Sequence, residues 1–184
     1  MRSVPLVSSV SLLAVVSFSA AAQQFNPGDN LAPYIPSPQI VVERMLELAR
    51  IRPGEIVYDL GSGDGRILIT AAQKFKARAV GIEMSPDLCK STMAKVERLG
   101  LQDLVKVLHA NLLKVDLSEA NIVTIYLLTS SNTRLRPNLE KYLKPGSRVV
   151  SNDFEIRGWR PKEVVNLRVE GMEHTIYLYE VAKH

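Results

Sequence analysis

Short apolar runs alternate with segments of helical spacing along the chain from residue 38 onward. The runs are rich in β-branched and aliphatic side chains and are bounded by turn residues, which is typical of buried strands. They predict strands over 56–60, 77–83, 105–109, 121–128 and 147–152. The segments between them space apolar residues three or four positions apart and predict helices over 38–50, 66–75, 86–99 and 129–143. Pro137 lies inside the last segment, so we expect that helix to be kinked or split.

Two further segments, 163–169 and 174–181, flank the turn residues Glu170-Gly171-Met172 and predict a terminal antiparallel pair. Strands that alternate with helices are typical of a mostly parallel sheet with helices on both faces. We therefore predict an α/β fold: a Rossmann-like three-layer sandwich with a mostly parallel seven-stranded sheet and a C-terminal antiparallel hairpin. Ligands of such sheets bind at the carboxyl ends of the strands.

The first 22 residues differ in composition from the rest of the chain. Arg2 gives a short positive start, residues 4–22 carry no charge, and Ala20-Ala21-Ala22 before Gln23 fits a small-residue cleavage pattern. This combination is typical of a secretory signal peptide, although the uncharged stretch approaches the length of a membrane-spanning anchor. We expect export to the periplasm or the outside of the cell. The alternative is an N-terminal membrane anchor with the domain facing the cytoplasm.

The length of 184 residues suits one ordinary domain, which we place at 38–184 after a proline-rich extended linker or arm over 23–37. The net charge is +4, but no run of Lys or Arg is present, so we expect no nucleic-acid partner. Cys89 is the only cysteine, which excludes an intramolecular disulfide, and we interpret it as a packed thiol. The three histidines are far apart and lack metal-ligand spacing, so no metal is predicted.

A glycine-rich turn joins the first predicted strand to the helix that follows it. Gly61, Gly63 and Gly65 alternate there, so the turn can use positive φ and a ligand can touch bare backbone. The free amides of the first helical turn would face that ligand. Arg66 occupies the third glycine position of a dinucleotide fold, and the Gly-Lys-Ser/Thr ending of a phosphate loop is absent. Both of those nucleotide sites are therefore disfavoured.

Three polar residues near predicted strand ends indicate what the turn binds instead. Asp59 precedes the turn, and a buried carboxylate needs partners such as a ligand ammonium or the loop amides. Glu83 ends the second strand, where it can accept both hydroxyls of a ribose; a solvated or helix-capping role is the alternative. Asn111 follows the third strand and suits an adenine edge or, alternatively, a turn. Together they favour an adenosine-containing ligand.

These residues carry a resemblance to a known class of enzymes. The sequence Asp59-Leu60-Gly61-Ser62-Gly63-Asp64-Gly65-Arg66, followed by Glu83 and Asn111-Leu112-Leu113, resembles the class I (seven-β-strand) S-adenosylmethionine-dependent methyltransferases. The resemblance narrows to the protein-lysine methyltransferases that include the ATP synthase c-subunit lysine methyltransferase and its prokaryotic relatives. The segments that narrow it are Pro33-Tyr34-Ile35-Pro36-Ser37-Pro38, Ile125-Tyr126-Leu127-Leu128 and residues 143–154.

The resemblance implies S-adenosylmethionine as the cofactor and methyl transfer to an acceptor amine, foremost a protein lysine. Tyr34 would close over the cofactor or shape the substrate entrance, and Tyr126 would stand where the amine meets the methyl group. The implied cofactor-binding residues are Asp59, Gly61, Ser62, Gly63, Asp64, Gly65, Glu83, Asn111 and Leu112. Two alternatives stay open: a small-molecule N- or O-methyltransferase, and a protein that binds S-adenosylmethionine or a nucleoside without turnover.

An apolar channel would favour the neutral amine that methyl transfer requires. Tyr34, Tyr126 and Trp159 are the aromatic residues that could wall it, while Trp159 and Tyr126 could equally serve packing. We expect no dedicated general base. Asp153 is the nearest spare carboxylate, and we interpret it as a solvated surface residue.

Overall fold

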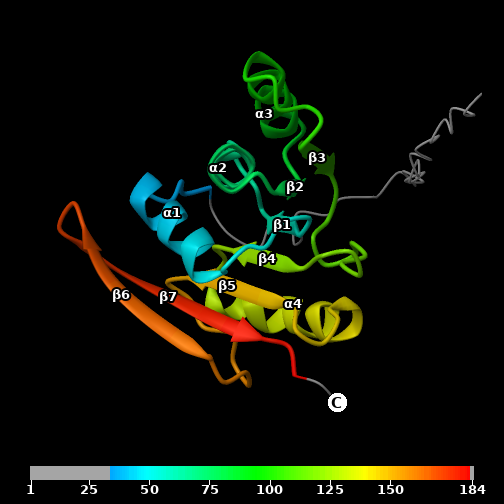
Figure 1. Ribbon diagram of the computed structural model, residues 1–184. Helices are drawn as coiled ribbons and strands as arrows, with labels where there is room; N and C mark the ends of the chain where they lie inside the picture. Colours follow the sequence, from blue (N-terminus) through cyan, green and yellow to red (C-terminus); the bar gives the residue numbers. More distant parts are fainter. Residues whose placement is uncertain (1–33, 183–184) are drawn as a thin grey trace, which may run out of the picture.

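The computed structural model describes residues 34–182, which form a seven-stranded sheet with helices on both faces (Figure 1). The strand order is β3-β2-β1-β4-β5-β7-β6. Strands β1 to β5 are parallel, and β7 runs antiparallel to both β5 and β6. The predicted α/β sandwich with a C-terminal hairpin is therefore confirmed. The predicted signal or anchor over 1–22 and the linker residues 23–33 lie outside the described residues.

The element bounds follow the sequence pattern to within a few residues. The strands are β1 (Ile56–Leu60), β2 (Arg78–Glu83), β3 (Val105–His109), β4 (Ile122–Ile125), β5 (Arg148–Asn152), β6 (Glu163–Val169) and β7 (Met172–Glu180). The helices are α1 (Gln39–Leu48), α2 (Arg66–Phe75), α3 (Pro86–Arg98) and α4 (Thr129–Tyr142). Among residues 34–182, no helix is long and apolar enough to cross a membrane.

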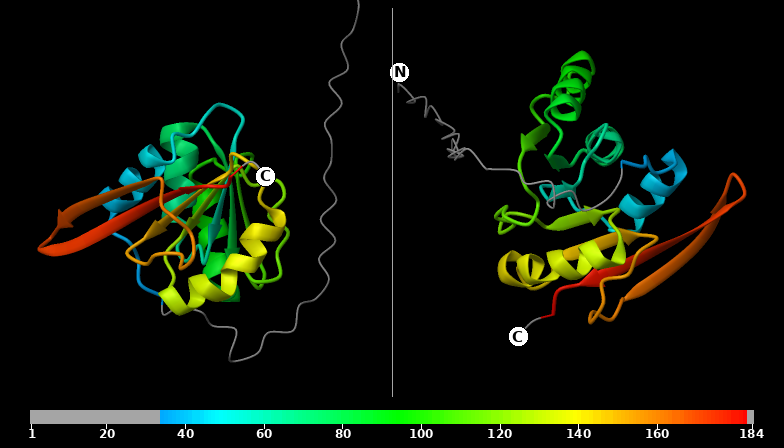
Figure 2. Two further views of the ribbon diagram at one scale, coloured as in Figure 1. Left: turned by 90° about the horizontal axis from the view of Figure 1, so that it is seen from below. Right: turned by 180° about the vertical axis from the view of Figure 1, so that it is seen from behind.

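Each face of the sheet has its own apolar core. Helices α1, α2 and α3 cover one face, where Met45, Leu68 and Val96 are fully buried (Figure 1). Helix α4 covers the other face with Leu135 and Leu139, together with apolar residues from the segment between β3 and β4. Both faces of the central strands are thus sealed, and only the strand ends are left for a ligand. The β6–β7 hairpin extends past the body of the domain (Figure 2).

Three details of the sequence prediction are wrong. Strand β4 ends at Ile125, because the following residues leave the sheet and Leu127 turns into a cavity at the strand ends. Strand β7 already begins at Met172, since Glu170 and Gly171 have φ of 51° and 85° and make a two-residue turn of the kind that tight hairpins favour. Pro137 does not split α4, which is one continuous helix whose buried leucines lie on both sides of the proline, while the kink expected there stays a prediction.

One buried cation ties α1 to the sheet. Arg148 at the start of β5 is 8% exposed, and its Nη1 donates to the carbonyl oxygens of Ala49 and Arg50, both at 2.7 Å. Its Nη2 pairs with Glu55. The guanidinium therefore satisfies the carbonyls at the carboxyl end of α1, which have no partner within the helix. This arrangement fixes α1, and with it the arm that precedes α1, relative to the strand ends.

Candidate functional site

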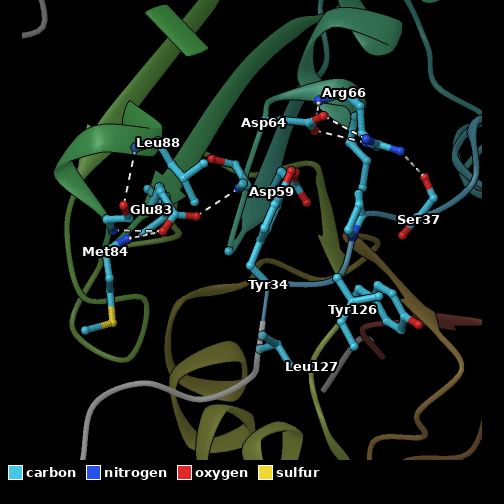
Figure 3. Close-up of a pocket in the computed structure, with 18 of the residues that line it drawn as sticks. Tyr34, Ser37, Asp59, Asp64, Arg66, Glu83, Met84, Leu88, Tyr126 and Leu127 are labelled. Atoms are coloured by element: carbon cyan, nitrogen blue, oxygen red, sulfur yellow. Dashed lines mark hydrogen bonds and ion pairs between the residues drawn. The ribbon is translucent and has the colours of Figure 1, made fainter. Parts of the chain in front are cut away.

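A cavity of about 400 Å³ lies at the carboxyl ends of β1, β2 and β4 (Figure 3). Its size falls within the usual range for small-ligand sites. The turn after β1 forms its floor, the end of β2 one wall, the tip of β4 another, and the arm of residues 34–37 covers it. This is the edge at which the sequence predicted a ligand. The cavity lining includes nine of the predicted site residues: Tyr34, Asp59, Gly61, Ser62, Gly63, Asp64, Glu83, Leu112 and Tyr126.

Two glycines of the turn have no room for a side chain. Gly63 has φ of 52°, and a Cβ there would lie 2.6 Å from Cε2 of Tyr34, so the tyrosine ring rests on bare backbone. Gly65 has φ of 74° and precedes α2; its Cβ would lie 2.4 Å from Cγ2 of Thr92 on α3. Gly65 therefore lies beside the cavity and not in its lining. Its role is to let the turn before α2 approach Thr92 of α3 closely.

Glu83 links the end of β2 to the glycine turn. Its Oε2 accepts from the amide of Gly63 at 2.8 Å, and its Oε1 accepts from the amides of Met84 and Ser85 at 2.9 and 2.8 Å (Figure 3). A carboxylate has about four acceptor positions, so one remains on Oε2. The carboxylate faces the cavity, as predicted for a ribose ligand. Accepting both ribose hydroxyls would require the bond from Gly63 to be exchanged for a ligand bond.

Asp59 is the buried acid of the site. It is 4% exposed, and its Oδ1 accepts from the Thr124 hydroxyl at 2.7 Å. Burial raises the pKa of Asp59 to about 7; the Thr124 hydrogen bond opposes this rise, and the charges of Glu83 and Asp64 add to it. A cation entering the cavity would offset the cost of ionising this carboxyl group. Asp59 is therefore placed to pair with a ligand ammonium, which is one of the partners predicted for it from the sequence.

The covering arm is held through Arg66, a residue that sequence reasoning did not assign to the site. Its guanidinium pairs with Asp64 at 2.7 Å and donates to the backbone oxygen of Ser37 (Figure 3). The arm thus closes against the glycine turn. Burial raises the pKa of Tyr34 in this arm; Asp64 and Glu83 add to the rise and Arg66 opposes it. The phenol stays protonated and can donate a hydrogen bond.

Tyr126 lines the cavity from the tip of β4. Its ring stacks on Phe154 with centroids 6.1 Å apart. Burial raises the pKa of Tyr126, and the negative charge of the Asp153 carboxylate raises it further. Asp153 also accepts from Nδ1 of His174 at 3.0 Å, so the interpretation of Asp153 as a solvated residue is wrong. Sequence reasoning missed His174, because only the antiparallel course of β7 brings it here.

Other predicted residues lie close to the cavity without facing it. Asn111 is fully buried, and its Oδ1 accepts from the amide of Leu113 at 3.0 Å in the turn after β3. Of the two residues predicted to contact adenine, Leu112 lines the cavity and Asn111 does not. The contact between Leu112 and adenine stays a prediction. Trp159 packs edge-on against Tyr179 at 5.8 Å and donates to Glu140 at 2.9 Å. It serves packing on the α4 side of the sheet, which is one of the two roles that the sequence left open, and it does not line the cavity.

The residues present fit an adenosyl ligand that carries an amino-acid group. The glycine turn offers backbone that a ligand can approach, Glu83 keeps a free acceptor position for a hydroxyl, and Asp59 can accept a cation. Leu112 and Leu88 supply apolar lining for a base. This donor set, at the strand ends of a mostly parallel sheet with a reversed C-terminal hairpin, defines a seven-strand S-adenosylmethionine-dependent methyltransferase.

Comparison with known protein families shows to which methyltransferase family the chain belongs. The sequence matches the ANTKMT methyltransferase domain over residues 59–163, more than half of the chain. The chain belongs to this family, and the family predicted from the sequence is confirmed. S-adenosylmethionine is the family's cofactor, and this chain is an S-adenosylmethionine-dependent methyltransferase.

Individual relatives agree with this placement. A protein-lysine N-methyltransferase of Saccharolobus islandicus is 50% identical over 83% of this chain and 95% of its own length. The human ATP synthase c-subunit lysine N-methyltransferase is 32% identical over 82% of this chain and 62% of its own length. A solved structure, described as an RNA methyltransferase from Salinibacter ruber in complex with S-adenosyl-L-homocysteine, is 46% identical. It covers 82% of this chain and 95% of its own, with a TM-score of 0.77.

Proposed function

We propose that this chain transfers a methyl group from S-adenosylmethionine to the side chain of a lysine in a protein. The observation that carries this proposal is the open wall of the cavity. Tyr34 and Ile35 line the cavity and yet are 55% and 58% exposed. A lysine side chain projecting from a large substrate can therefore reach the tip of β4 while the rest of the substrate stays outside. The names of the Saccharolobus and human relatives support this acceptor class.

When bound, the cofactor supplies a methyl group on a positively charged sulfur. The lysine nitrogen forms its bond to the methyl carbon as the bond from carbon to sulfur breaks, and the electron pair of that bond goes to the sulfur. The lysine must first lose a proton, because an ammonium has no lone pair and the reference pKa is about 10.4. Desolvation between Tyr34 and Tyr126 favours the neutral amine, and the released proton goes to solvent at the open mouth.

The chain itself binds and orients, and this is the main contribution that a displacement of this kind needs. Glu83 and the glycine turn would hold the nucleoside and its amino-acid group, and Arg66 keeps the arm against them. Tyr126 would contact the acceptor amine. The carboxylates of the lining have protein partners: Asp59 with Thr124, Asp64 with Arg66, and Glu83 with three amides.

RNA is the competing acceptor class, because the Salinibacter structure is described as an RNA methyltransferase. The charge of this chain argues against it. The net charge is only +4, and the basic residues form no run along the sequence. Arg66 is the basic residue of the cavity lining, and its charge is engaged with Asp64. A long RNA requires several free cations along its backbone. Protein lysine is therefore the better supported acceptor.

A radiolabel assay distinguishes the acceptor classes. The full chain is incubated with tritiated S-adenosylmethionine and, separately, with membrane protein, soluble protein, total RNA and free amines from the same cells. We expect label in a protein band and a methylated lysine in its peptide map. Label confined to RNA or to small metabolites would contradict the proposal, and binding of the cofactor without any transfer would support a non-catalytic binder.

Two variants calibrate this assay. Glu83→Ala removes the predicted ribose contact and should lower labelling about tenfold or more when S-adenosylmethionine is not saturating. Glu97→Ala changes an exposed carboxylate of α3 that does not line the cavity, and it should leave labelling unchanged. Equal labelling by both variants would mean that the transfer does not take place in this cavity.

We also propose that residues 1–22 direct the chain to the cell envelope, either as a cleaved export signal or as an uncleaved anchor. The support is compositional: Arg2 is followed by a charge-free stretch over 4–22 that ends in three alanines. N-terminal sequencing of the protein recovered from cells tests this. A chain that begins near Gln23 supports export, an intact Met1 in the membrane fraction supports an anchor, and an intact Met1 in the soluble fraction contradicts both.

A further inference from the structure

Large apolar side chains are exposed beside the mouth of the cavity. Tyr34 and Ile35 line the cavity from the covering arm and are 55% and 58% exposed. Leu128 is 41% exposed and directly follows Leu127, which lines the cavity at the tip of β4. Tyr34, Ile35 and Leu128 form an apolar rim. Single exposed apolar residues are ordinary, but a group of them beside a cavity marks an interaction site.

The glycine turn brings the two sides of the apolar rim together. A Cβ at Gly63 would lie 2.6 Å from Cε2 of Tyr34, and a Cβ at Gly61 would lie 3.6 Å from Cδ2 of Leu127. These glycines are two residues apart in one turn, so Tyr34 and Leu127 lie over neighbouring parts of the same backbone (Figure 3). The rim therefore borders one stretch of the cavity edge, from the arm to the start of α4.

The charge of the cavity behind the rim suits a cation. The carboxylates of Asp64 and Glu83 outnumber the guanidinium of Arg66 in the lining, and Asp59 adds to them when it is ionised. A lysine side chain brings a positive charge on an apolar stem. The stem matches the rim, and the charge matches the acids within.

The size of the rim argues against a second copy of the chain as its occupant. Each partner buries about 800 Å² in a stable protein interface. Three half-exposed side chains supply only a small part of that area. The rim is instead continuous with the cavity that the proposed acceptor must enter, so a segment of the substrate is the partner that it fits.

The reaction itself gives a reason to cover the rim. More than half of Tyr34 and of Ile35 is exposed in the free chain, so water reaches the mouth. Apolar residues of a substrate, placed beside its lysine, would cover the rim and exclude water from the channel. Exclusion of water favours the neutral amine that methyl transfer requires. The substrate would thus complete a wall that the chain leaves open.

We propose that the apolar rim is a docking surface for apolar residues that flank the target lysine in a protein substrate. The preferred acceptor is then a lysine within an apolar stretch of its chain, and a lysine among polar residues is a poor substrate. The inference rests on the proposed function, because it requires a lysine acceptor.

Two peptides test this preference. Each contains one lysine in an otherwise identical soluble sequence, with two leucines on both sides of the lysine in one peptide and two serines in the other. We expect the kcat/KM of the leucine-flanked peptide to be about tenfold higher or more, the scale of covering the exposed parts of two large apolar side chains. Equal values, or a preference for the serine-flanked peptide, would overturn the proposal.

Four variants show whether the rim recognises the flanking residues. Ile35→Ser and Leu128→Ser should each lower the ratio of kcat/KM between the two peptides about threefold or more. Leu99→Ser and Val164→Ser change side chains that are 43% and 46% exposed at the end of α3 and on β6, outside the cavity lining, and should keep the ratio of the unmodified chain. Because both peptides are compared on one protein, a partial loss of folded chain does not alter this ratio. An unchanged ratio in both rim variants, or an equal loss in Leu99→Ser, would overturn the proposal.

A second readout does not depend on turnover. Norleucine has the apolar stem of lysine without the amine, so peptides that carry it cannot be methylated. Fluorescence anisotropy of the two labelled norleucine peptides, with S-adenosylhomocysteine present, measures docking alone. We expect tighter binding of the leucine-flanked peptide and a weakening of that binding by Ile35→Ser. Equal affinities of the two peptides would overturn the inference even if lysine methylation is found.

Two further outcomes identify other failures. Absence of lysine methylation on every peptide and protein tested would overturn the proposed function, and the inference with it. Sedimentation velocity tests for a second copy of the chain on the rim, and we expect the unmodified chain and Ile35→Ser to sediment alike. A dimer that Ile35→Ser dissolves would show that a second copy covers the rim and would overturn the proposal.

Discussion

The carboxylate of Glu83 accepts a hydrogen bond from the backbone amide of Gly63 at 2.8 Å. This bond ties the end of β2 to the turn after β1 and presents both to the same cavity. It belongs to a set of three amide bonds that keep the carboxylate in place before a ligand arrives. A preformed acceptor of this kind lowers the ordering cost of binding.

Glu83→Gln should weaken S-adenosylmethionine binding about tenfold or more. A glutamine has one carbonyl oxygen, and its NH₂ group would have to face either the Gly63 amide or the amides of Met84 and Ser85. Titration calorimetry measures the change. Glu97→Gln, on the exposed side of α3, is the matched control and should bind as the unmodified chain does. Equal affinities for the two variants would refute a direct role of Glu83.

Asp59 should make folding stability depend on pH. Its pKa is about 7 in the folded chain and about 3.9 in an unfolded one, so the folded state holds a proton that the unfolded state releases between these values. The contribution of Asp59 to the free energy of unfolding is therefore full below about pH 4 and lost as the pH rises through about 7. Urea unfolding measures the free energy of unfolding at about pH 5 and at about pH 8. Between these two pH values, this free energy should fall more for the unmodified chain than for Asp59→Asn. Identical falls would contradict the raised pKa.

Gly65→Ala should lower the free energy of unfolding by about 2 kcal/mol or more, because it combines a left-handed φ with a Cβ placed 2.4 Å from Thr92 Cγ2. Adding Thr92→Ser removes that methyl group and keeps the hydroxyl that donates to the Gly63 oxygen, so it should restore part of the loss. Gly100→Ala isolates the backbone strain, since φ is 65° and nothing lies within 4 Å. A Gly65→Ala cost no greater than that of Gly100→Ala would contradict the close approach of Gly65 to Thr92.

Arg148→Ala should lower the free energy of unfolding by about 3–5 kcal/mol. It leaves the Glu55 carboxylate and the carbonyls at the end of α1 without their buried partner. Arg168→Ala removes an ion pair whose side chains are 71% and 70% exposed and should change stability by less than about 1 kcal/mol. Urea unfolding of both variants checks the contrast, and a loss below about 1 kcal/mol for Arg148→Ala would be inconsistent with its contacts.

Most elements were predictable because their signals are local. The strand over 56–60, the helix over 66–75 and the strand over 105–109 have the predicted bounds, since each is a run of apolar residues closed by Gly, Pro or polar turn residues. The predicted end of β4 was wrong because tertiary contacts end the strand before its apolar run ends. The apolar stretch after Ile125 resembles more strand, but Leu127 buries itself in the cavity and ends the pairing.

The parts of the site that lie at the carboxyl ends of the strands were predictable from the sequence. Because carboxyl ends of neighbouring parallel strands meet at one edge, a turn after β1 and an acid at the end of β2 must lie together whatever the details of packing. The Arg66–Ser37 contact was not predictable, since the arm and α2 are 29 residues apart and meet only after α1 docks.

By itself, the sequence determined that a mostly parallel sheet would form, that Gly61–Gly65 would meet Glu83 at one edge, and that the ligand would contain adenosine. Periodicity and glycine spacing are properties of short segments, so they can be interpreted without knowledge of the packing. Only the tertiary structure decided the partners of Asp153. The antiparallel return of β7 brings His174 and Thr175 to it across 21 and 22 residues, and no local pattern encodes that register. An acid that looked solvated in the sequence thereby pairs with a buried imidazole.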